Sequence, residues 1–369
     1  MRSSSRTVEL SIEPGHTLLV TGPARIRLSV GMADCLAAPL RLDEWVMVRE
    51  LRQYPLQIIE RCEIQIELEQ QSSWMVVDES TVPVGWLEAA HVAKRQLGAI
   101  AIVGEANSGK SSLCAFLTNM CVRDGLRVGV VDGDVGQADI GPPTTVSSAK
   151  ATSPVMSLQE LRSEHSFFVG DTSPSSVPEK LIRQLISLKQ DLATSTDLLI
   201  LNTDGWIGDS TAVRFKEELL ARIRPDLVLG LGGNEIEPLL RMLSSPTLKL
   251  SSSHYARARS KDERKNAREA GYRRFLADSK VLSISQENTR LRMFDQPQQS
   301  ILQWDRRYNG FLTGLLDSDE RLLTIGRVRD MHDGTALVET RATEQPRFLE
   351  VGNVMVSSSY EETGSWKLH

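Results

Sequence analysis

The chain of 369 residues is poor in aromatic side chains, in cysteine and in long apolar runs. Aromatic residues make up 5% of it, and its four cysteines include no C-x-x-C pair, so neither a zinc site nor a disulfide framework is indicated. No apolar run approaches the length of a membrane-spanning helix. Residues 1–6 lead into an alternating segment, without the apolar core of a signal peptide. We therefore expect a soluble, intracellular, cytoplasmic protein that makes no contact with membranes.

The sequence also lacks a strong net charge. Its formal charge of −5 at pH 7 does not mark a nucleic-acid-binding protein, although a chain-wide sum averages over local patches. Hydrophobic residues make up 40% and charged residues 25%, which is ordinary for a globular protein. A chain of this length has room for about two to three domains.

One motif in the sequence has a specific chemical meaning. The segment GEANSGKS at 104–111 follows an apolar run and precedes residues with helical spacing, as in the phosphate loops that bind nucleoside triphosphates. Backbone N–H groups of such a loop surround the phosphates at a helix N-terminus. The predicted cofactor-binding residues are Gly104, Glu105, Ala106, Asn107, Ser108, Gly109, Lys110, Ser111 and Ser112. Lys110 is expected to reach the β- and γ-phosphates, and Ser111 to ligate Mg²⁺.

Strands and helices alternate around this loop. Apolar strands are expected at 99–103, 127–131, 198–201 and 226–231, with helices between them, which predicts parallel strands joined by right-handed crossovers. Short alternating strands separated by turn residues are typical of small sandwiches or barrels, and they occupy both ends of the chain. We therefore predict an α/β fold with a β-rich N-terminal domain at 1–90, a central P-loop NTPase domain with a parallel sheet at 91–289, and a small β-rich C-terminal domain at 290–369.

An acidic motif, DGDVGQ at 132–137, follows the strand after the phosphate loop. Carboxylates at the C-terminal end of a parallel strand lie where ligands bind in open α/β sheets. One carboxylate can hold Mg²⁺, and another can accept a proton from an attacking hydroxyl. A solvated turn is the alternative, but the place beside the phosphate loop favours the functional interpretation.

Three further segments each allow two interpretations. Trp206 ends a strand and can stack on a base or simply pack. Thr172 and Ser173 can hold a phosphate, although helix capping is the more common use of such hydroxyls. The segment 257–274 has eight Lys or Arg against three Asp or Glu, so it is either a solvated helix face or part of a mobile lid, predicted at 251–280, whose arginines neutralise a phosphoryl group.

Taken together, the motifs resemble those of the polynucleotide 5′-hydroxyl kinase family. That family includes the RNA kinase of the eukaryotic pre-mRNA cleavage factor and the nucleolar kinase of ribosomal RNA processing. The resemblance rests on the phosphate loop, DGDVGQ with a following Pro-Pro pair, T-x-G-W at 203–206, R-S-x-x-x-R at 259–264 and T-S-P at 172–174. The three-part layout extends it to nearly the whole chain.

The resemblance implies a role for each matched residue. Asp134 is the implied general base for the 5′-hydroxyl, supported by Asp132 and Gln137, and Trp206 would stack on the terminal base. The implied catalytic residues are Lys110, Asp134, Arg259 and Arg264; the implied substrate-binding residues are Gln137, Thr172, Ser173 and Trp206; and the implied metal ligands are Ser111, Asp132 and Asp134.

The expected activity is therefore transfer of the ATP γ-phosphoryl group to the 5′-OH end of RNA, with single-stranded DNA as a second candidate acceptor. ATP and Mg²⁺, or another divalent cation, are the implied cofactors, and no protein partner is implied. A catalytically silent, ATP-binding scaffold subunit is the alternative, but the four implied catalytic residues favour the enzyme. A GTPase switch would need an N-K-x-D motif, for which there is no convincing match. Glu105 stands where many relatives have proline and adds unfavourable charge unless it points outward.

Overall fold

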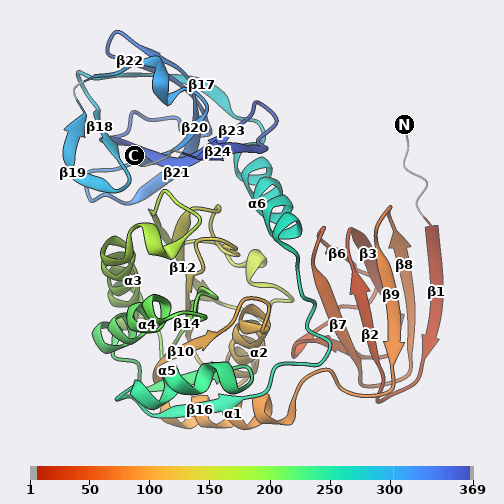
Figure 1. Cartoon of the computed structure of the whole chain (residues 1–369). Coiled ribbons are helices and arrows are strands. Elements are labelled where there is room, and N and C mark those ends of the chain that lie inside the picture. The colour runs from red at the N-terminus through yellow and green to blue at the C-terminus, as the bar shows by residue number, and fades with distance from the viewer. Residues whose placement is uncertain (1–5, 302, 366–369) are drawn as a thin grey trace.

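The computed structural model describes residues 6–301 and 303–365 (Figure 1). Residues 1–5 and 366–369, at the outer ends of the two predicted terminal domains, lie outside the described residues. The expectation about a signal peptide concerned residues 1–6 and therefore falls mostly outside them too. Among the described residues, no helix has the length and apolar character needed to cross a membrane. All four cysteines are free and buried.

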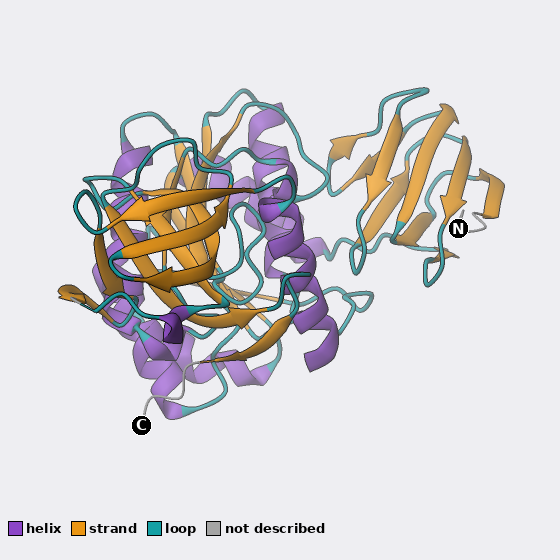
Figure 2. Ribbon diagram, turned by 90° about the horizontal axis from the view of Figure 1, so that it is seen from above, coloured by secondary structure: helices purple, strands orange, loops and turns teal. Residues whose placement is uncertain are grey.

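The N-terminal region consists of two antiparallel sheets packed face to face. One has the order β1-β8-β3-β6 and the other β5-β4-β7-β2-β9. Their strands are β1 (Arg6–Ile12), β2 (Thr17–Thr21), β3 (Ala24–Val30), β4 (Ala33–Cys35), β5 (Ala38–Pro39), β6 (Trp45–Val48), β7 (Gln53–Ile58), β8 (Cys62–Leu68) and β9 (Ser73–Val77). Alternate residues such as Ile64 and Ile66 on β8 are buried, because successive side chains of a strand point to opposite faces. These strands stand beside the helix-covered remainder of the molecule (Figure 2).

A seven-stranded sheet forms the centre, in the order β13-β12-β11-β14-β10-β15-β16. Five strands are parallel: β10 (Gly98–Gly104), β11 (Val128–Gly133), β14 (Leu198–Thr203), β15 (Leu227–Leu231) and β16 (Thr247–Leu250). The predicted parallel core is therefore confirmed. An antiparallel edge, β12 (Thr145–Ala151) and β13 (His165–Phe168), adds to the predicted parallel strands. The chain returns from β11 through a loop without a crossover helix, and such a return places the next strand antiparallel.

Helices cover both faces of the central sheet. They are α1 (Val84–Gln96), α2 (Lys110–Arg123), α3 (Pro178–Ala193), α4 (Ser210–Ile223), α5 (Glu237–Met242) and α6 (Lys261–Leu276), with short turns of 3₁₀ helix η1 (Leu158–Glu160), η2 (Pro174–Ser176), η3 (Asn234–Ile236) and η4 (Arg306–Tyr308). Ile100 and Ile102 of β10 pack with α1 and α2, and that core continues into the N-terminal sheets. Ala99 and Ala101 pack with α3 and α4 on the opposite face.

The C-terminal sheet has eight strands, in the order β17-β22-β21-β20-β23-β18-β19 with β24 beside β23. The strands are β17 (Lys280–Ser285), β18 (Arg290–Met293), β19 (Gln296–Ile301), β20 (Phe311–Leu316), β21 (Leu322–His332), β22 (Thr335–Thr340), β23 (Phe348–Val356) and β24 (Glu362–Ser365). The predicted boundary at 290 leaves β17 with the central domain, whereas β17 pairs with β22. Its KVLSIS pattern alternates weakly, and only Ile284 of it is buried.

Candidate active site

The phosphate loop connects β10 to α2. Gly109 has φ +97°, a left-handed conformation that glycine adopts without strain, and α2 begins at Lys110. Lys110 is buried, and its ammonium group donates hydrogen bonds to the carbonyl oxygens of Gly104 at 3.0 Å and Glu105 at 2.7 Å. Burial lowers the pKa of Lys110 to about 8, although the nearby Asp134 carboxylate opposes this. The Glu105 side chain is exposed, so water screens the charge that it adds to the loop.

The T-x-G-W segment lies directly on the phosphate loop. A Cβ at Gly205 would stand 2.6 Å from the backbone nitrogen of Ala106, so only glycine fits there. The Thr203 hydroxyl donates to the Ile102 carbonyl at 2.8 Å. Asp204 accepts from the Trp206 backbone N–H at 2.9 Å and pairs with the fully buried Lys216. The Asp204–Lys216 pair, which we did not predict, therefore holds the turn in place.

A side-chain network joins the phosphate loop to the acidic strand end. β11 and β14 pair with Asp132 opposite Asn202, and the Asn202 amide donates to the Ser111 hydroxyl at 3.3 Å and to the Asp132 carboxylate at 3.2 Å. Asp132 is buried and also accepts from the backbone N–H groups of Asp139 and Ile140 at 2.6 and 3.1 Å. Burial, followed by the charge of Asp139, raises the pKa of Asp132 to about 7. The parallel register was the signal that could have indicated Asn202.

Asp134 faces the phosphate loop from the acidic turn. Its Oδ1 accepts from the backbone N–H groups of Gly136 at 3.2 Å and Gln137 at 2.9 Å, which fixes the direction of the carboxylate. Burial raises the pKa of Asp134, and the positive charge of Lys110 partly opposes that rise. The carboxylate is thus positioned to accept a proton beside the cation expected to bind phosphates.

The oxygen atoms at this site suit Mg²⁺. The Asn202 side-chain oxygen is buried and has no hydrogen-bond partner among the described residues, and it belongs to the residue that bridges Ser111 and Asp132. Within residues 6–301 and 303–365, no three His, Cys, Asp or Glu side chains gather that could hold a metal by themselves. Mg²⁺ in phosphate-transfer sites is usually held by one or two protein oxygens, substrate phosphates and water, so Ser111 with Asp132 or Asp134 fits that ion.

The arginines of the lid segment lie on the same pocket. Arg259 donates to the Gln137 side-chain oxygen at 3.4 Å, and the Gln137 amide donates to the Arg264 carbonyl at 3.1 Å. Burial, and then the charge of Arg52, lower the pKa of Arg259 to about 10. One pocket is lined by Lys110, Ser111, Asp134, Gln137, Arg259 and Arg264, among others. Ser260 and Glu263 form a capping box that starts α6 between the two arginines.

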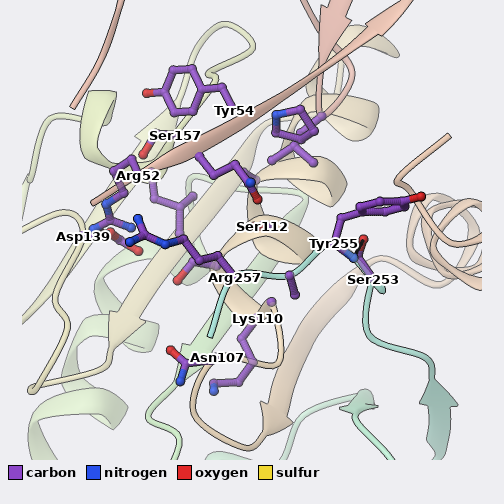
Figure 3. Close-up of a pocket in the computed structure, with 18 of the residues that line it drawn as sticks. Arg52, Tyr54, Asn107, Lys110, Ser112, Asp139, Ser157, Ser253, Tyr255 and Arg257 are labelled. Atoms are coloured by element: carbon purple, nitrogen blue, oxygen red, sulfur yellow. Dashed lines mark hydrogen bonds and ion pairs between the residues drawn. The ribbon is translucent and has the colours of Figure 1, made fainter. Parts of the chain in front are cut away.

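The N-terminal region supplies a wall of this pocket that the sequence did not reveal. Arg52, which precedes β7, forms an ion pair with the buried Asp139 of the loop after the acidic motif. Figure 3 shows Arg52 and Asp139 on one side of the pocket, Tyr255 on the other, and Lys110 below them. The Tyr255 hydroxyl donates to Glu79 at 2.7 Å. Neither Arg52 nor Asp139 belongs to a recognisable motif.

The segment Thr172–Ser173, predicted to hold the nucleic acid and called the clasp below, lies against the acidic turn. Asp171 accepts from the backbone N–H groups of Thr172 at 2.6 Å and Ser173 at 3.1 Å. A Cβ at Gly136 would be 2.9 Å from the Thr172 carbonyl oxygen, so the two loops touch. The Ser173 hydroxyl contacts that of Ser175 at 2.8 Å and makes no capping bond to η2. Neither Thr172 nor Ser173 lines the pocket around Lys110.

Trp206 is anchored from one side. Its indole N–H donates to Asp209 at 2.8 Å, and its ring stacks on Phe215 with centroids 5.8 Å apart and an interplanar angle of 30°. The ring remains partly exposed and does not line the pocket around Lys110. Packing is therefore observed, and stacking on a base stays a prediction.

Comparisons with known proteins agree with the predicted resemblance. Residues 104–278 match the family described as mRNA cleavage and polyadenylation factor CLP1 P-loop. A polyribonucleotide 5′-hydroxyl-kinase of Pyrococcus furiosus is 33% identical over 190 residues, covering 51% of this chain and 53% of the relative. One from Methanocaldococcus jannaschii is 31% identical, covering 50% and 52%. A Caenorhabditis elegans polynucleotide 5′-hydroxyl-kinase, nol-9, is 30% identical over 30% of this chain and 21% of its own length.

The curated archaeal relatives are thus matched over about half their length. The fold extends further, since a solved structure described as a wild-type Clp1p–Pcf11p complex superposes with a TM-score of 0.78. That comparison covers 96% of this chain and 99% of the other at 9% identity, so it shows the shared fold alone. The resemblance predicted from the motifs and the predicted fold class are both confirmed.

Proposed function

We propose that this chain, whose residues 104–278 match the CLP1 P-loop family, is an ATP-dependent polynucleotide 5′-hydroxyl kinase acting on the 5′-OH ends of RNA. The observation that carries the proposal is the shared placement of Asp134, Lys110 and the two lid arginines on one pocket. The loop with Lys110 is enough to hold a nucleotide, whereas a carboxylate and two further cations on the same pocket supply what transfer to a hydroxyl needs. The names of the relatives support RNA as the acceptor.

The residues divide the transfer between them. The 5′-hydroxyl oxygen of the acceptor attacks the γ-phosphorus, the bond from that phosphorus to the oxygen of the leaving ADP breaks, and the hydroxyl proton passes to Asp134. Lys110 neutralises the β- and γ-phosphates, and Arg259 and Arg264 neutralise charge on the transferring group. The Gln137 side chain bonds to the lid segment at Arg259 and Arg264, and its amide also donates to the Gly136 carbonyl of the acidic turn. Held in this way, Gln137 orients the acceptor.

Mg²⁺ bound by Ser111 with Asp132 or Asp134 would supply further positive charge on the phosphate oxygens. Asn202 orients both of the residues it bridges through its amide. Thr172, Ser173 and Trp206 are the proposed contacts to the nucleic acid beyond its reacting end.

The proposal is tested with γ-labelled ATP, Mg²⁺ and a 5′-OH oligoribonucleotide, with an oligodeoxyribonucleotide in parallel. We expect label to appear on the oligonucleotide, and Asp134→Asn to lower the transfer rate by about 100-fold or more, as for loss of a general base. Lys110→Ala is expected to abolish transfer.

Asp278→Asn is the matched control, because Asp278 is exposed and has φ +60°, a conformation that asparagine tolerates. It should transfer label at the wild-type rate. Absence of transfer by the wild-type protein, together with ATP binding that depends on Lys110, would identify a silent scaffold instead. Unchanged transfer by Asp134→Asn would refute the assignment of the base.

A further inference from the structure

Beside the candidate active site lies a second groove, between the N-terminal sheets and helix α6. It encloses about 1050 Å³, including space open to solvent. Arg49 contributes from the segment after β6, Arg274 and Phe275 from α6, and Pro143 from the loop after the acidic motif. Arg52 and Gln137 line both this groove and the active-site pocket. The groove therefore begins where the reacting end of an acceptor would lie.

Most arginines of the groove are already neutralised. Arg25 pairs with Glu67, Arg52 pairs with Asp139, and Arg268 donates two hydrogen bonds to Glu362 at 2.6 and 2.7 Å. Each of these guanidinium groups has a carboxylate partner, so none of them needs a ligand to balance its charge.

Arg49 and Arg274 differ from the others. Within the described part of the chain, the arginines of this groove that form ion pairs are Arg25, Arg52 and Arg268, and no side-chain hydrogen bond is found for Arg49 or Arg274. Arg274 is partly buried and lies over the Phe275 ring at 4.4 Å. Burial, followed by the positive charge of Arg49, lowers the pKa of Arg274 to about 10. The charge of Asp139 partly opposes this lowering, and the exposed Arg49 partly opposes the burial-induced rise in the pKa of Glu160. Neither carboxylate hydrogen-bonds to these two guanidinium groups, so their donors remain available to an anion.

We propose that Arg49 and Arg274 bind internucleotide phosphates of the acceptor strand, downstream of the 5′-OH end that sits near Gln137. This inference rests on the proposed kinase function. A polynucleotide carries one phosphate for every residue beyond its reacting end, and arginine matches phosphate oxygens with two parallel donors. The half-buried Phe275 and the buried Pro143 also line the groove and add apolar surface to it.

The donor nucleotide does not explain this groove, because its phosphates are expected at Lys110 in the other pocket. Glu50 and Glu69 also line the groove, but both are exposed, so solvent and salt screen their repulsion of a phosphate. The arrangement predicts that affinity grows with acceptor length until the strand passes both arginines.

Binding of a fluorescent 5′-OH oligoribonucleotide of about ten nucleotides tests the proposal without requiring turnover. Anisotropy titrations at several salt concentrations compare wild type with Arg49→Gln, Arg274→Gln and their combination. Each lost phosphate contact should reduce the slope of log K against log salt by about 0.7. We expect affinity to fall about threefold to tenfold for each single variant at low salt.

Arg273→Gln is the matched control. Arg273 is exposed, neighbours Arg274 on α6 and does not line the groove, so the variant removes the same charge a few ångströms away. A second comparison uses acceptor length: KM for a nucleoside 3′-phosphate should be unchanged in Arg274→Gln, whereas KM for the long acceptor should rise. Thermal melting checks that each variant is folded.

Equal losses in Arg273→Gln and Arg274→Gln would overturn the proposal, as would equal effects on short and long acceptors. It would also fall if the wild-type protein bound inorganic phosphate but no oligonucleotide. Arginine-dependent binding without label transfer would refute the kinase function and leave the groove standing. Label transfer by the wild-type protein, with unchanged oligonucleotide binding in both arginine variants, would support the kinase function and refute the role of the groove.

Discussion

The N-terminal sheets reach the candidate active site with their own side chains, whereas the C-terminal sheet touches it only through residues of the central region. Arg52 lines the pocket and pairs with Asp139. On the other side, Asn353 of β23 donates its backbone N–H to the Gly170 carbonyl at 2.6 Å and its side-chain amide to Asp171 at 2.7 Å. Asp171 in turn holds the clasp.

The C-terminal sheet also holds helix α6. Glu362 of β24 binds Arg268 and donates its backbone N–H to Glu269 at 2.8 Å, while Tyr272 and Leu276 pack against Leu312 and Leu316. A region without any chemical motif thus supports both the clasp and the helix that carries Arg264. The N-terminal region therefore contacts the pocket directly, whereas the C-terminal sheet supports the segments that shape it.

The largest expected effect follows from removing the ion pair between Arg52 and Asp139. Arg52→Met leaves Asp139 buried without its cation, which typically costs about 3–5 kcal/mol of unfolding free energy. Urea denaturation measures this loss, and ATP titration should show weakened binding. The double variant Arg52→Met/Asp139→Asn removes both charges and should recover part of the stability. If the single variant is as stable as wild type, the pair contributes nothing to joining the two regions.

A smaller and more selective effect is expected from removing the hydrogen bond between Asn353 and Asp171. Asn353→Ala removes the amide that fixes Asp171, so the clasp loses its orientation. Loss of a hydrogen bond to a charged group is worth about 1.5 kcal/mol or more, and we expect KM for the 5′-OH acceptor to rise about tenfold while KM for ATP is unchanged. Steady-state kinetics with each substrate varied in turn provides the measurement.

Asn309→Ala is the control for Asn353→Ala, since Asn309 binds Asp330 at 2.9 Å in the same sheet and does not line the active-site pocket. It should leave both KM values unchanged. A rise in KM for ATP in Asn353→Ala would show that the C-terminal sheet acts on the whole site and would remove the contrast.

ATP affinity is expected to depend on pH through Lys110, whereas the contribution of the arginines is not. The ammonium form of Lys110 is the one that binds phosphates, and its pKa is lowered to about 8. ATP affinity should therefore fall above pH 8, approaching tenfold per pH unit. Calorimetric titration of ATP measures this, and oligonucleotide affinity, which depends on arginines, should not show the same fall.

The lowered pKa of Lys110 also makes the free energy of unfolding depend on pH. Because the folded pKa of Lys110 lies below its ordinary value of 10.5, the folded chain binds fewer protons than the unfolded chain between about pH 8 and 10.5. The Lys110 contribution to unfolding free energy therefore rises with pH in that window. Lys110→Met should abolish that contribution, and it should also abolish the pH dependence of any residual ATP binding.

Much of this site was open to prediction because its residues stand in local motifs. Gly109 and Lys110 belong to a loop whose spacing is dictated by phosphate geometry, and Asp134 follows a strand whose apolar run is plain. Asn202 was recoverable only through strand register, and Arg52 only through tertiary packing, since no local pattern marks a residue that meets Asp139 from 87 positions away. Strand β17 was not recognised, because its weak alternation does not indicate a pairing partner.

Helix α6 also determines how this chain could be recombined with its relatives. Its first turn carries Arg264, while Tyr272 and Leu276 at the other end are buried against the C-terminal sheet. A chimera joined at residue 280 would separate the helix from the surface that shaped it, whereas a junction near 251–260 would transfer helix and sheet together. Helix α6 and the C-terminal sheet therefore form one structural unit. We expect substitutions in the helix to be accompanied by substitutions in the sheet.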